Sequence, residues 1–445
     1  MYLCLNISYI KGSKSTPQEV VDVEPDRISF LPGHVIDCIL SYLPIKEAVR
    51  TSVLSDKWRH KWYTLPNLVF DVQCVSHVAS QDRLVTENKF LKIVDHVLLV
   101  HSGAINMFKF VDGEDLVSDS ADIDRWILHL TGRSIKELVL EVCMEKRYQI
   151  PWCLFSCQSL QRLKLDWCVL KPPTMFQGFK NLKSIDLNLV MVAQGVFGNL
   201  ISGCPQLEEL KLIEVEGLDQ INIHAPNLKL FEIVGEFEGI SFENTFQLTT
   251  IVIDSYLDLN SESNQRKPHG WSSNLLKFFD YQPHIQSLEI SSYFLKYLAA
   301  GVLPVKLPTP CIHLGFLSLS INFDDLNEIS AALCLLRSSP NLRKLEIYVH
   351  TVPLTPATYC WEDIFSRPVM PFQVRHVMIR SYRISVTKSE LDFIKYLLLY
   401  SPVLEKMTVK PFANVVPELM KALMRFKRAS VEAEVIWEDP FKNGE

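Results

Sequence analysis

A triad of apolar residues with the spacing i, i+3 and i+5 recurs along most of the chain. The first copy starts at residue 105 and the last at residue 404, and successive copies start 20 to 37 residues apart. The last two members of each triad alternate on one side of an extended backbone, so every copy predicts a short strand with one buried face. The copies are Ile105/Phe108/Phe110, Ile135/Leu138/Leu140, Leu160/Leu163/Leu165, Leu182/Ile185/Leu187, Leu207/Leu210/Leu212, Leu228/Phe231/Ile233, Leu248/Ile251/Ile253, Ile285/Leu288/Ile290, Leu314/Leu317/Leu319, Leu342/Leu345/Ile347, Val374/Val377/Ile379 and Leu404/Met407/Val409.

Several copies follow a helical run and carry a proline two residues before the triad, as in SGCPQLEELKL, SSPNLRKLEI and YSPVLEKMTV. Helix, proline stop and strand therefore form the repeating unit. The period overlaps that of leucine-rich repeats, which predicts an α/β fold in the form of an irregular leucine-rich-repeat solenoid, or horseshoe. The same spacing arises by chance in any leucine-rich chain, so an ordinary α/β fold is the alternative, and the number of copies favours the solenoid.

A different pattern precedes the repeats. Between His34 and Leu43 the apolar residues follow helical spacing, and Pro44 ends that helix. A second helix is expected from about Lys46 to Ser55, and a third after it places Trp58 and Trp62 on one face. So small a helical block cannot bury its whole apolar stripe within itself, so part of the stripe is expected to pack on a helical partner or, alternatively, on the first repeat.

Composition narrows the classes of function. The 445 residues carry a formal net charge of -6, which gives no general reason to bind nucleic acid or an anionic membrane surface. No apolar run is long enough to span a bilayer, and residues 1–25 are predicted to be a loose leader and not a signal peptide. Eleven scattered cysteines without a C-x-x-C pair indicate thiols in a reducing compartment, hence nucleus or cytoplasm.

Motifs for catalysis are missing from the sequence. It contains no glycine-rich phosphate loop, G-x-S-x-G elbow, H-E-x-x-H helix or cysteine-rich zinc pattern. Cys153 and Cys157 are four residues apart, but further metal ligands are not at hand, so buried thiols are favoured. His96 and His101 lack a carboxylate at a telling spacing. We therefore predict no catalytic residue, no metal and no cofactor.

The segment DRISFLPGHVIDCILSYLPIKEAVRTSVLSDKWRHKWYTLPNLVFD, residues 26–71, closely resembles the F-box of the large plant family that joins an F-box to leucine-rich repeats and a carboxyl-terminal FBD region. The segment RHVMIRSYRISVTKSELDFIKYLLLYSPVLEKMTVK, residues 375–410, is similar to the FBD signature. The chain departs from the family at Gly33-His34, where an acidic residue is usual, at His60-Lys61, and at Ser381–Ile384. The expected organisation is a leader over 1–25, an F-box over 26–71, the solenoid over 72–350, an insertion over 351–371 and FBD-type terminal repeats with a cap over 372–445.

The resemblance implies a receptor subunit of a Skp-cullin-F-box ubiquitin ligase. In that family the F-box binds a Skp-like adaptor, and through it cullin and RING subunits, while the repeats hold the target; the subunit itself is not an enzyme. The expected adaptor-binding residues are Leu31, Pro32, Ile36, Ile39, Leu40, Leu43, Pro44, Ala48, Val49, Val53, Trp58 and Trp62, with Leu31, Pro32 and Trp58 as anchors. A scaffold outside a ligase and a receptor that needs a small molecule are the alternatives.

The outward strand residues suggest where a target binds. Early and middle copies present mainly acidic residues, whereas the late copies are more basic, with Glu346 as the only acid. An acidic or phosphorylated target element is therefore expected near the late repeats, although charge for solubility alone is the simpler explanation. The long segments 254–271 and 351–371, the second with Trp361, are further candidates, and residues 421–428 are expected to form a capping helix. The predicted target-binding residues are Lys344, His376, Arg380, Lys406 and Lys410.

Overall fold

The chain divides into two units, Met1–Trp62 and Tyr63–Glu445, which are described separately. The computed structural model describes residues 27–71, 74, 83–112, 120–193, 195–218, 220–237, 239–255, 274–279, 284–299, 303–350, 371–382, 388–411, 421 and 423–438. The leader over 1–25 and nearly all of the two long segments predicted as recognition loops, including Trp361, lie outside these residues.

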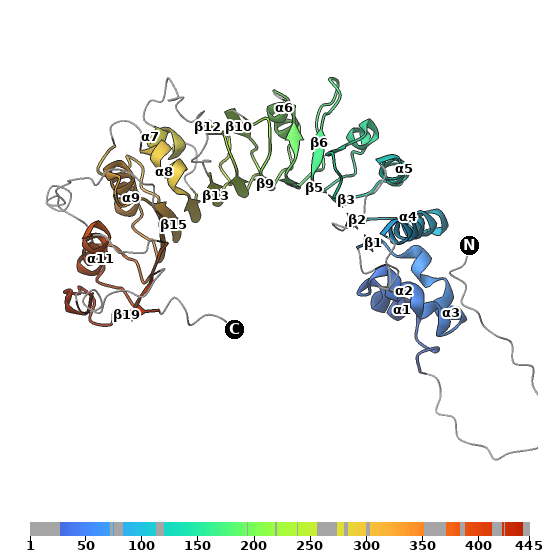
Figure 1. The fold of residues 1–445 in the computed structure, drawn as a ribbon, viewed down its shortest axis with the longest axis horizontal. Coiled ribbons are helices and arrows are strands. Elements are labelled where there is room, and N and C mark those ends of the chain that lie inside the picture. Colours follow the sequence, from blue (N-terminus) through green and yellow to red (C-terminus); the bar gives the residue numbers. More distant parts are fainter. Residues whose placement is uncertain are drawn as a thin grey trace, which may run out of the picture. The chain divides into compact units, whose positions relative to one another are not determined.

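Short helices make up the described part of the first unit (Figure 1). The first helix, α1, begins after Pro32, whose φ of -59° suits a helix start, and it ends before Tyr42. The predicted second helix is a helix followed by a 3-10 turn, and the third begins at Asp56 behind the cap position Ser55. The elements are α1 (Gly33–Ser41), α2 (Ile45–Arg50), η1 (Thr51–Val53), α3 (Asp56–Arg59) and η2 (Lys61–Thr64), the last of which runs across the boundary between the units.

A 14-stranded parallel sheet is the backbone of the second unit. Its strands follow one another in chain order, apart from the short outer strands, so each repeat contributes one strand next to that of the preceding repeat. In Figure 1 the strands line the inner side of a curved solenoid and the helices lie on its outer side. The strands are β1 (Asn67–Phe70), β2 (Met107–Val111), β3 (Glu137–Glu141), β5 (Arg162–Asp166), β7 (Ser184–Asn188), β9 (Glu209–Ile213), β11 (Leu230–Val234), β13 (Thr250–Asp254), β14 (Ser287–Ile290), β15 (Phe316–Ile321), β16 (Lys344–Val349), β17 (His376–Ser381), β18 (Lys406–Lys410) and β19 (Glu434–Trp437).

The outer layer changes along the solenoid. Helices cover the first and last repeats, whereas the outer layer of the middle repeats combines two small sheets, β4-β6-β8 and β10-β12, with the short helices η4 and α6. The outer elements are α4 (Arg83–Val100), α5 (Ser120–Thr131), β4 (Tyr148–Gln149), η4 (Trp152–Ser156), β6 (Cys168–Leu170), β8 (Met191–Val192), α6 (Val196–Ser202), β10 (Gln220–His224), β12 (Gly239–Glu243), α7 (Asn274–Phe279), α8 (Ser292–Leu298), α9 (Leu326–Ser338) and α11 (Lys388–Tyr400).

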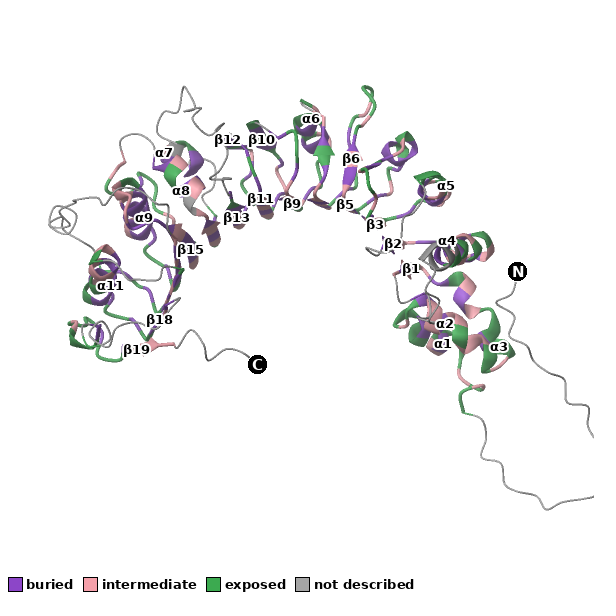
Figure 2. Cartoon of the chain, in the orientation of Figure 1, coloured by how far each residue is buried: buried purple, intermediate pink, exposed green. Residues whose placement is uncertain are grey.

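The register of the sheet confirms the triad prediction. The middle residue of each triad pairs with the middle residue of the next, as in Leu163 with Ile185 and Leu345 with Val377. Every residue of the twelve triads is buried, with at most 3% of its surface exposed. The triads therefore form one continuous core between the sheet and the outer layer (Figure 2), and the α/β solenoid is confirmed.

Two strands lie beyond the predicted copies. Leu65, Leu68 and Phe70 have the triad spacing, are buried, and bring β1 into register with β2. The strand β1 thus belongs to the repeat sheet, although residues 26–71 were all expected to form the F-box. At the other end β19 adds a half-buried strand, and Leu423 is buried in the part of the predicted capping helix that the structure describes.

Candidate functional site

The interior of the first unit is built from bulky residues of its short helices. Ile36 and Leu40 of α1 are fully buried, as is Ala48 of α2. Trp58 is only 3% exposed, and its indole Nε1 donates a hydrogen bond of 3.2 Å to the carbonyl oxygen of Ile28. These contacts use helical spacing to bury one side of each element and hold the segment before α1 against α3.

This interior changes the role expected for Trp58. Only 3% of Trp58 is exposed, so little of its side chain is accessible to a partner, and its contacts in the structure hold the helices in place. Pro32 is exposed and Leu31 is half-buried, so these two anchors remain accessible. Among the twelve predicted adaptor-binding residues, the buried ones are Ile36, Leu40, Ala48, Trp58 and Trp62, the half-buried ones Leu31, Leu43 and Val49, and the exposed ones Pro32, Ile39, Pro44 and Val53.

Exposed apolar side chains mark the accessible face of the first unit. They include large residues that the sequence reading did not single out, because they lie outside the helical stripe. Soluble proteins rarely leave this many large apolar groups exposed on so short a segment unless something covers them. We call this set the exposed apolar residues: Ile28 (48% exposed), Phe30 (75%), Ile39 (38%), Tyr42 (82%), Val53 (72%) and Leu54 (45%).

Two departures from the family pattern meet in space. The Lys61 ammonium forms an ion pair with Asp37 of α1, at 2.9 Å from Oδ1. It also lies where a Cβ at Gly33 would be 3.3 Å away. The lysine at position 61 and the missing side chain at position 33 therefore accommodate each other, and together they set the charge at the start of α1.

The open face of the repeat sheet, which points away from the helices, carries the predicted target-binding residues. The register places Lys344, His376 and Lys406 side by side across β16, β17 and β18. Arg380 and Lys410 form a second neighbouring pair four residues further along the same strands. The structure thus brings all five together in two rows at the late repeats.

Acidic residues partly neutralise these rows. Lys344 pairs with Glu346 at 2.7 Å, and His376 Nε2 lies 3.6 Å from Glu405 Oε2. The unpredicted strand β19 adds Glu434 opposite Lys406, and Glu438 just beyond it pairs with Lys410. The strand β19 therefore adds acidic residues to a region where Glu346 was the only acid expected among the predicted copies.

Aromatic side chains accompany the basic rows. The Lys344 ammonium lies 5.0 Å from the centre of the Phe316 ring, and the Arg380 guanidinium lies 5.9 Å from that of Tyr348. Tyr348 in turn stacks on Tyr382, with ring centres 6.4 Å apart. The sequence reading missed these rings, although Phe316 and Tyr348 occupy outward positions of their triads and could have been found there. Cation–π contacts of this kind fix the orientation of long basic side chains.

Acidic residues lie on the open face in the middle repeats, earlier in the chain than the basic rows. Burial raises the pKa of Glu289, and the nearby carboxylates Glu346 and Glu232 raise it further. Burial also raises the pKa of Asp186, although Lys164 and Lys211 oppose that effect. Acidic residues thus lie on the middle of the open face, and the basic rows lie on its late part together with the acids that pair with them.

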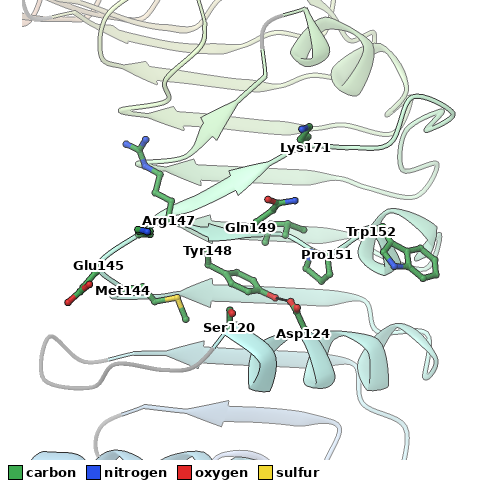
Figure 3. Close-up of a pocket in the computed structure, with 12 residues that line it drawn as sticks. Ser120, Asp124, Met144, Glu145, Arg147, Tyr148, Gln149, Pro151, Trp152 and Lys171 are labelled. Atoms are coloured by element: carbon green, nitrogen blue, oxygen red, sulfur yellow. Dashed lines mark hydrogen bonds between the residues drawn. The ribbon is translucent and has the colours of Figure 1, made fainter.

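Two cavities open on the second unit. The first, of about 780 Å³, lies beside β4 and is drawn in Figure 3. Two of the polar residues that line it have partners: the Tyr148 hydroxyl donates to Asp124 at 2.5 Å, and Arg147 binds Glu216 with two hydrogen bonds of 2.6 and 2.7 Å. Burial and the Asp124 contact raise the pKa of Tyr148, which keeps the hydroxyl protonated. These bonds tie the segment of β4 to α5 and to Glu216.

The second cavity, of about 800 Å³, opens where β15, β16 and β17 begin. Arg343 and Arg375 line it together with His313 and several amides. It borders the row of Lys344, His376 and Lys406 on the open face.

The described residues provide neither a metal-binding group nor a membrane-spanning helix. Over the described ranges, no group of histidine, cysteine and carboxylate side chains is arranged to hold a metal ion. Cys153 and Cys157 are both buried, as expected of structural thiols. Within the same ranges, no helix combines the length and apolar character that crossing a bilayer requires.

The fold and these surfaces define a repeat protein with a small helical unit at its amino-terminal end. A family model described as the LRR repeats of the FBD-associated F-box protein At5g56370 matches residues 123–347, and the F-box domain model matches residues 28–70. The F-box/FBD/LRR-repeat protein At1g13570 of Arabidopsis thaliana is 38% identical over 93% of this chain and 98% of its own. The putative F-box protein At3g58860 of the same plant is 27% identical over 86% of this chain and 88% of its own. The chain belongs to the F-box/FBD/LRR-repeat family.

Proposed function

We propose that this protein is the target-binding receptor subunit of a Skp-cullin-F-box ubiquitin ligase. The F-box would bind a Skp-like adaptor, and the repeats would bind a target protein for ubiquitination. The observation that carries the proposal is the match of residues 28–70 to the F-box model, on a unit that leaves a set of large apolar side chains exposed. The ligase assembly would work in the nucleus or cytoplasm.

The chain would act through binding and not through catalysis. Ubiquitin transfer would be performed by other subunits, while this chain raises the concentration of target lysines near the charged enzyme. The names of its relatives describe an F-box, an FBD region and repeats, which are binding modules. No cofactor is part of the proposed activity.

The adaptor contact is tested with exposed residues, because changing a buried one would also unfold the unit. We expect Ile39→Glu combined with Val53→Glu to lower capture of a purified Skp-like adaptor by at least about tenfold, since two carboxylates would be placed in an apolar interface. Lys57→Ala, on the exposed side of α3, serves as the matched control and should leave capture unchanged. Affinity is measured with the purified full chain by surface plasmon resonance. Equal affinity of the double variant and the unaltered chain would contradict the proposal.

A second candidate function is a scaffold that works outside a ligase. It is favoured by the changed charge at the start of α1, where Gly33 and Lys61 meet. Affinity capture of the full chain with the proteasome blocked separates the two. Recovery of targets without adaptor or cullin supports the scaffold, and recovery of all three together supports the receptor.

A further inference from the structure

One row of residues runs along the edge of the sheet where the strands begin. Each member directly follows the first residue of its triad, and its amide nitrogen donates to the carbonyl oxygen of the preceding member, as in Arg343 to Gly315 and Arg375 to Arg343, both at 2.9 Å. Side chains of adjacent repeats therefore stand next to one another, about 4.8 Å apart at the backbone. We call this the rim row, and its members from β3 onward are Lys136, Gln161, Lys183, Glu208, Lys229, Thr249, Gln286, Gly315, Arg343, Arg375 and Glu405.

A glycine opens a hollow in the rim row. Gly315 stands between Gln286 and Arg343, and a Cβ there would have its nearest neighbour at 3.9 Å. The missing side chain leaves space that the neighbours do not fill, and this is where the cavity of about 800 Å³ lies. We call it the rim pocket.

The side chains around the rim pocket are hydrogen-bond donors. Arg343, Arg375 and His313 carry or can accept positive charge, and no carboxylate occurs among the described residues that line the cavity. Arg343 is exposed and forms no ion pair within the described part of the chain. Arg375 uses one terminal nitrogen for Glu405, at 2.7 Å, which holds the guanidinium in place while its other N–H groups stay available.

In the middle of the rim row, the basic side chains are paired with an acidic neighbour. There Glu208 stands between Lys183 and Lys229 and pairs with both, at 3.4 and 2.7 Å. Both lysines of that region are therefore engaged in ion pairs within the row. At the rim pocket only Arg375 pairs with an acid, Glu405, so the Arg343 guanidinium is left without an ion pair in the described part of the chain, beside a cavity.

The rim of the pocket is apolar on both sides. Ile312 is 48% exposed and Val403 is 37% exposed, and Phe316, which directly follows Gly315, also lines the cavity. Apolar edges around a cationic cavity suit a peptide, whose backbone and flanking side chains extend beyond the charged group. The planar donor forks of two neighbouring arginines match the three oxygens of a phosphate monoester better than a single carboxylate.

We propose that the rim pocket binds a phosphorylated serine or threonine of the target protein, with Arg343 and Arg375 on the phosphate and Ile312 and Val403 against the flanking residues. The biological use of this site rests on the proposed function, because it would make target capture depend on phosphorylation. The binding chemistry itself does not depend on the adaptor.

The test compares two fluorescein-labelled peptide pools with degenerate flanks, one with a central phosphoserine and one with serine. We expect the immobilised full chain to retain the phosphoserine pool at least tenfold better. Arg343→Gln combined with Arg375→Gln should remove this preference. Gly315→Gln should lower it too, because it fills the hollow without changing the charge. Lys183→Gln with Lys229→Gln changes the net charge equally in the same row and should keep the preference.

Each other result counts against the proposal. Equal retention of both pools by the unaltered chain, or a preference that survives in the arginine variant, would overturn it. Strong binding of free inositol hexakisphosphate without any preference between the pools would assign the pocket to a free anion instead. Adaptor affinity is measured on the same preparations, so that loss of the adaptor contact, which tests the proposed function, is seen separately. Unchanged thermal unfolding of the exposed-residue variants confirms that they are folded.

Discussion

Buried carboxyl groups occur at the starts of two outer helices. Glu328 is the third residue of α9 and Glu390 the third residue of α11, and both are almost completely buried. Glu328 Oε2 accepts a hydrogen bond of 2.9 Å from the amide nitrogen of Asn322, which directly follows β15. The side chain thus ties the end of the strand to the start of the helix, in the manner of a capping glutamate.

The titration of Glu328 gives a prediction for stability. Burial, with Asp325 adding to it, raises the pKa from 4.5 to about 8. The folded chain then holds the proton more tightly than the unfolded chain, so this group's contribution is complete below about pH 4.5 and is lost as the pH rises to about 8. Between pH 5 and 8.5 the unaltered chain should lose unfolding free energy as Glu328 ionises. The loss for Glu328→Gln should be smaller by at least about 1 kcal/mol, since one pKa unit corresponds to about 1.4 kcal/mol. Urea unfolding at both pH values measures it.

The control for this effect is Glu145→Gln, which changes an exposed carboxyl of the same unit. It should follow the unaltered chain at both pH values. If Glu328→Gln shows the same decline with pH as Glu145→Gln, Glu328 is not the group that titrates.

The burial or exposure of some single residues does not follow from the sequence pattern. The spacing of Trp58 and Trp62 on one face was recognised, and both were assigned to the partner surface. The structure buries both, because a small helical unit has few side chains to form its interior and the indole rings bring large apolar areas to it. Phe30 and Tyr42, which are the most exposed large apolar groups of the first unit, lie outside any helical stripe and gave no signal.

At the scale of elements, the strand β1 decides where the repeat unit begins. Phe70 packs on Phe108 of the next strand, with ring centres 5.6 Å apart, and β1 covers the edge of β2. The triad of β1 has the regular spacing, but it directly follows the helical block and was read as part of it. In β19 the triad spacing falls on Glu432, Val435 and Trp437. Its first member is charged instead of apolar, so the sequence pattern does not identify it as a copy.

The boundary can be tested with two shortened chains. A chain that starts at Tyr63 keeps β1 and should stay monomeric. A chain that starts at residue 72 exposes the edge of β2 and the Phe108 ring, so it should aggregate, because an uncovered strand edge pairs with other chains. Size-exclusion chromatography with light scattering at one protein concentration compares them. Identical behaviour of both chains would show that β1 does not cap the sheet.

For the whole second unit, stability is expected to depend on contacts between neighbouring repeats. Leu210 of β9 lies between two repeats and is fully buried, whereas Val435 of the last strand has one neighbour in the sheet and is half-buried. Leu210→Ala should cost about 2–5 kcal/mol of unfolding free energy, and Val435→Ala less than about 1 kcal/mol. Urea unfolding followed by circular dichroism measures both. Equal losses would contradict a solenoid in which the last repeat is a cap.

The sequence by itself determined the repeat, the inward direction of every triad and the membership of the family. These depend on alternation along one strand and on an ordered motif, and both are local in the chain. Only the tertiary structure decided which outward side chains become neighbours. Gly315, Arg343 and Arg375 are about thirty residues apart, and they meet because the sheet brings repeats of unequal length into one register. The burial of Trp58 was decided in the same way, since it depends on packing between helices and not on their periodicity.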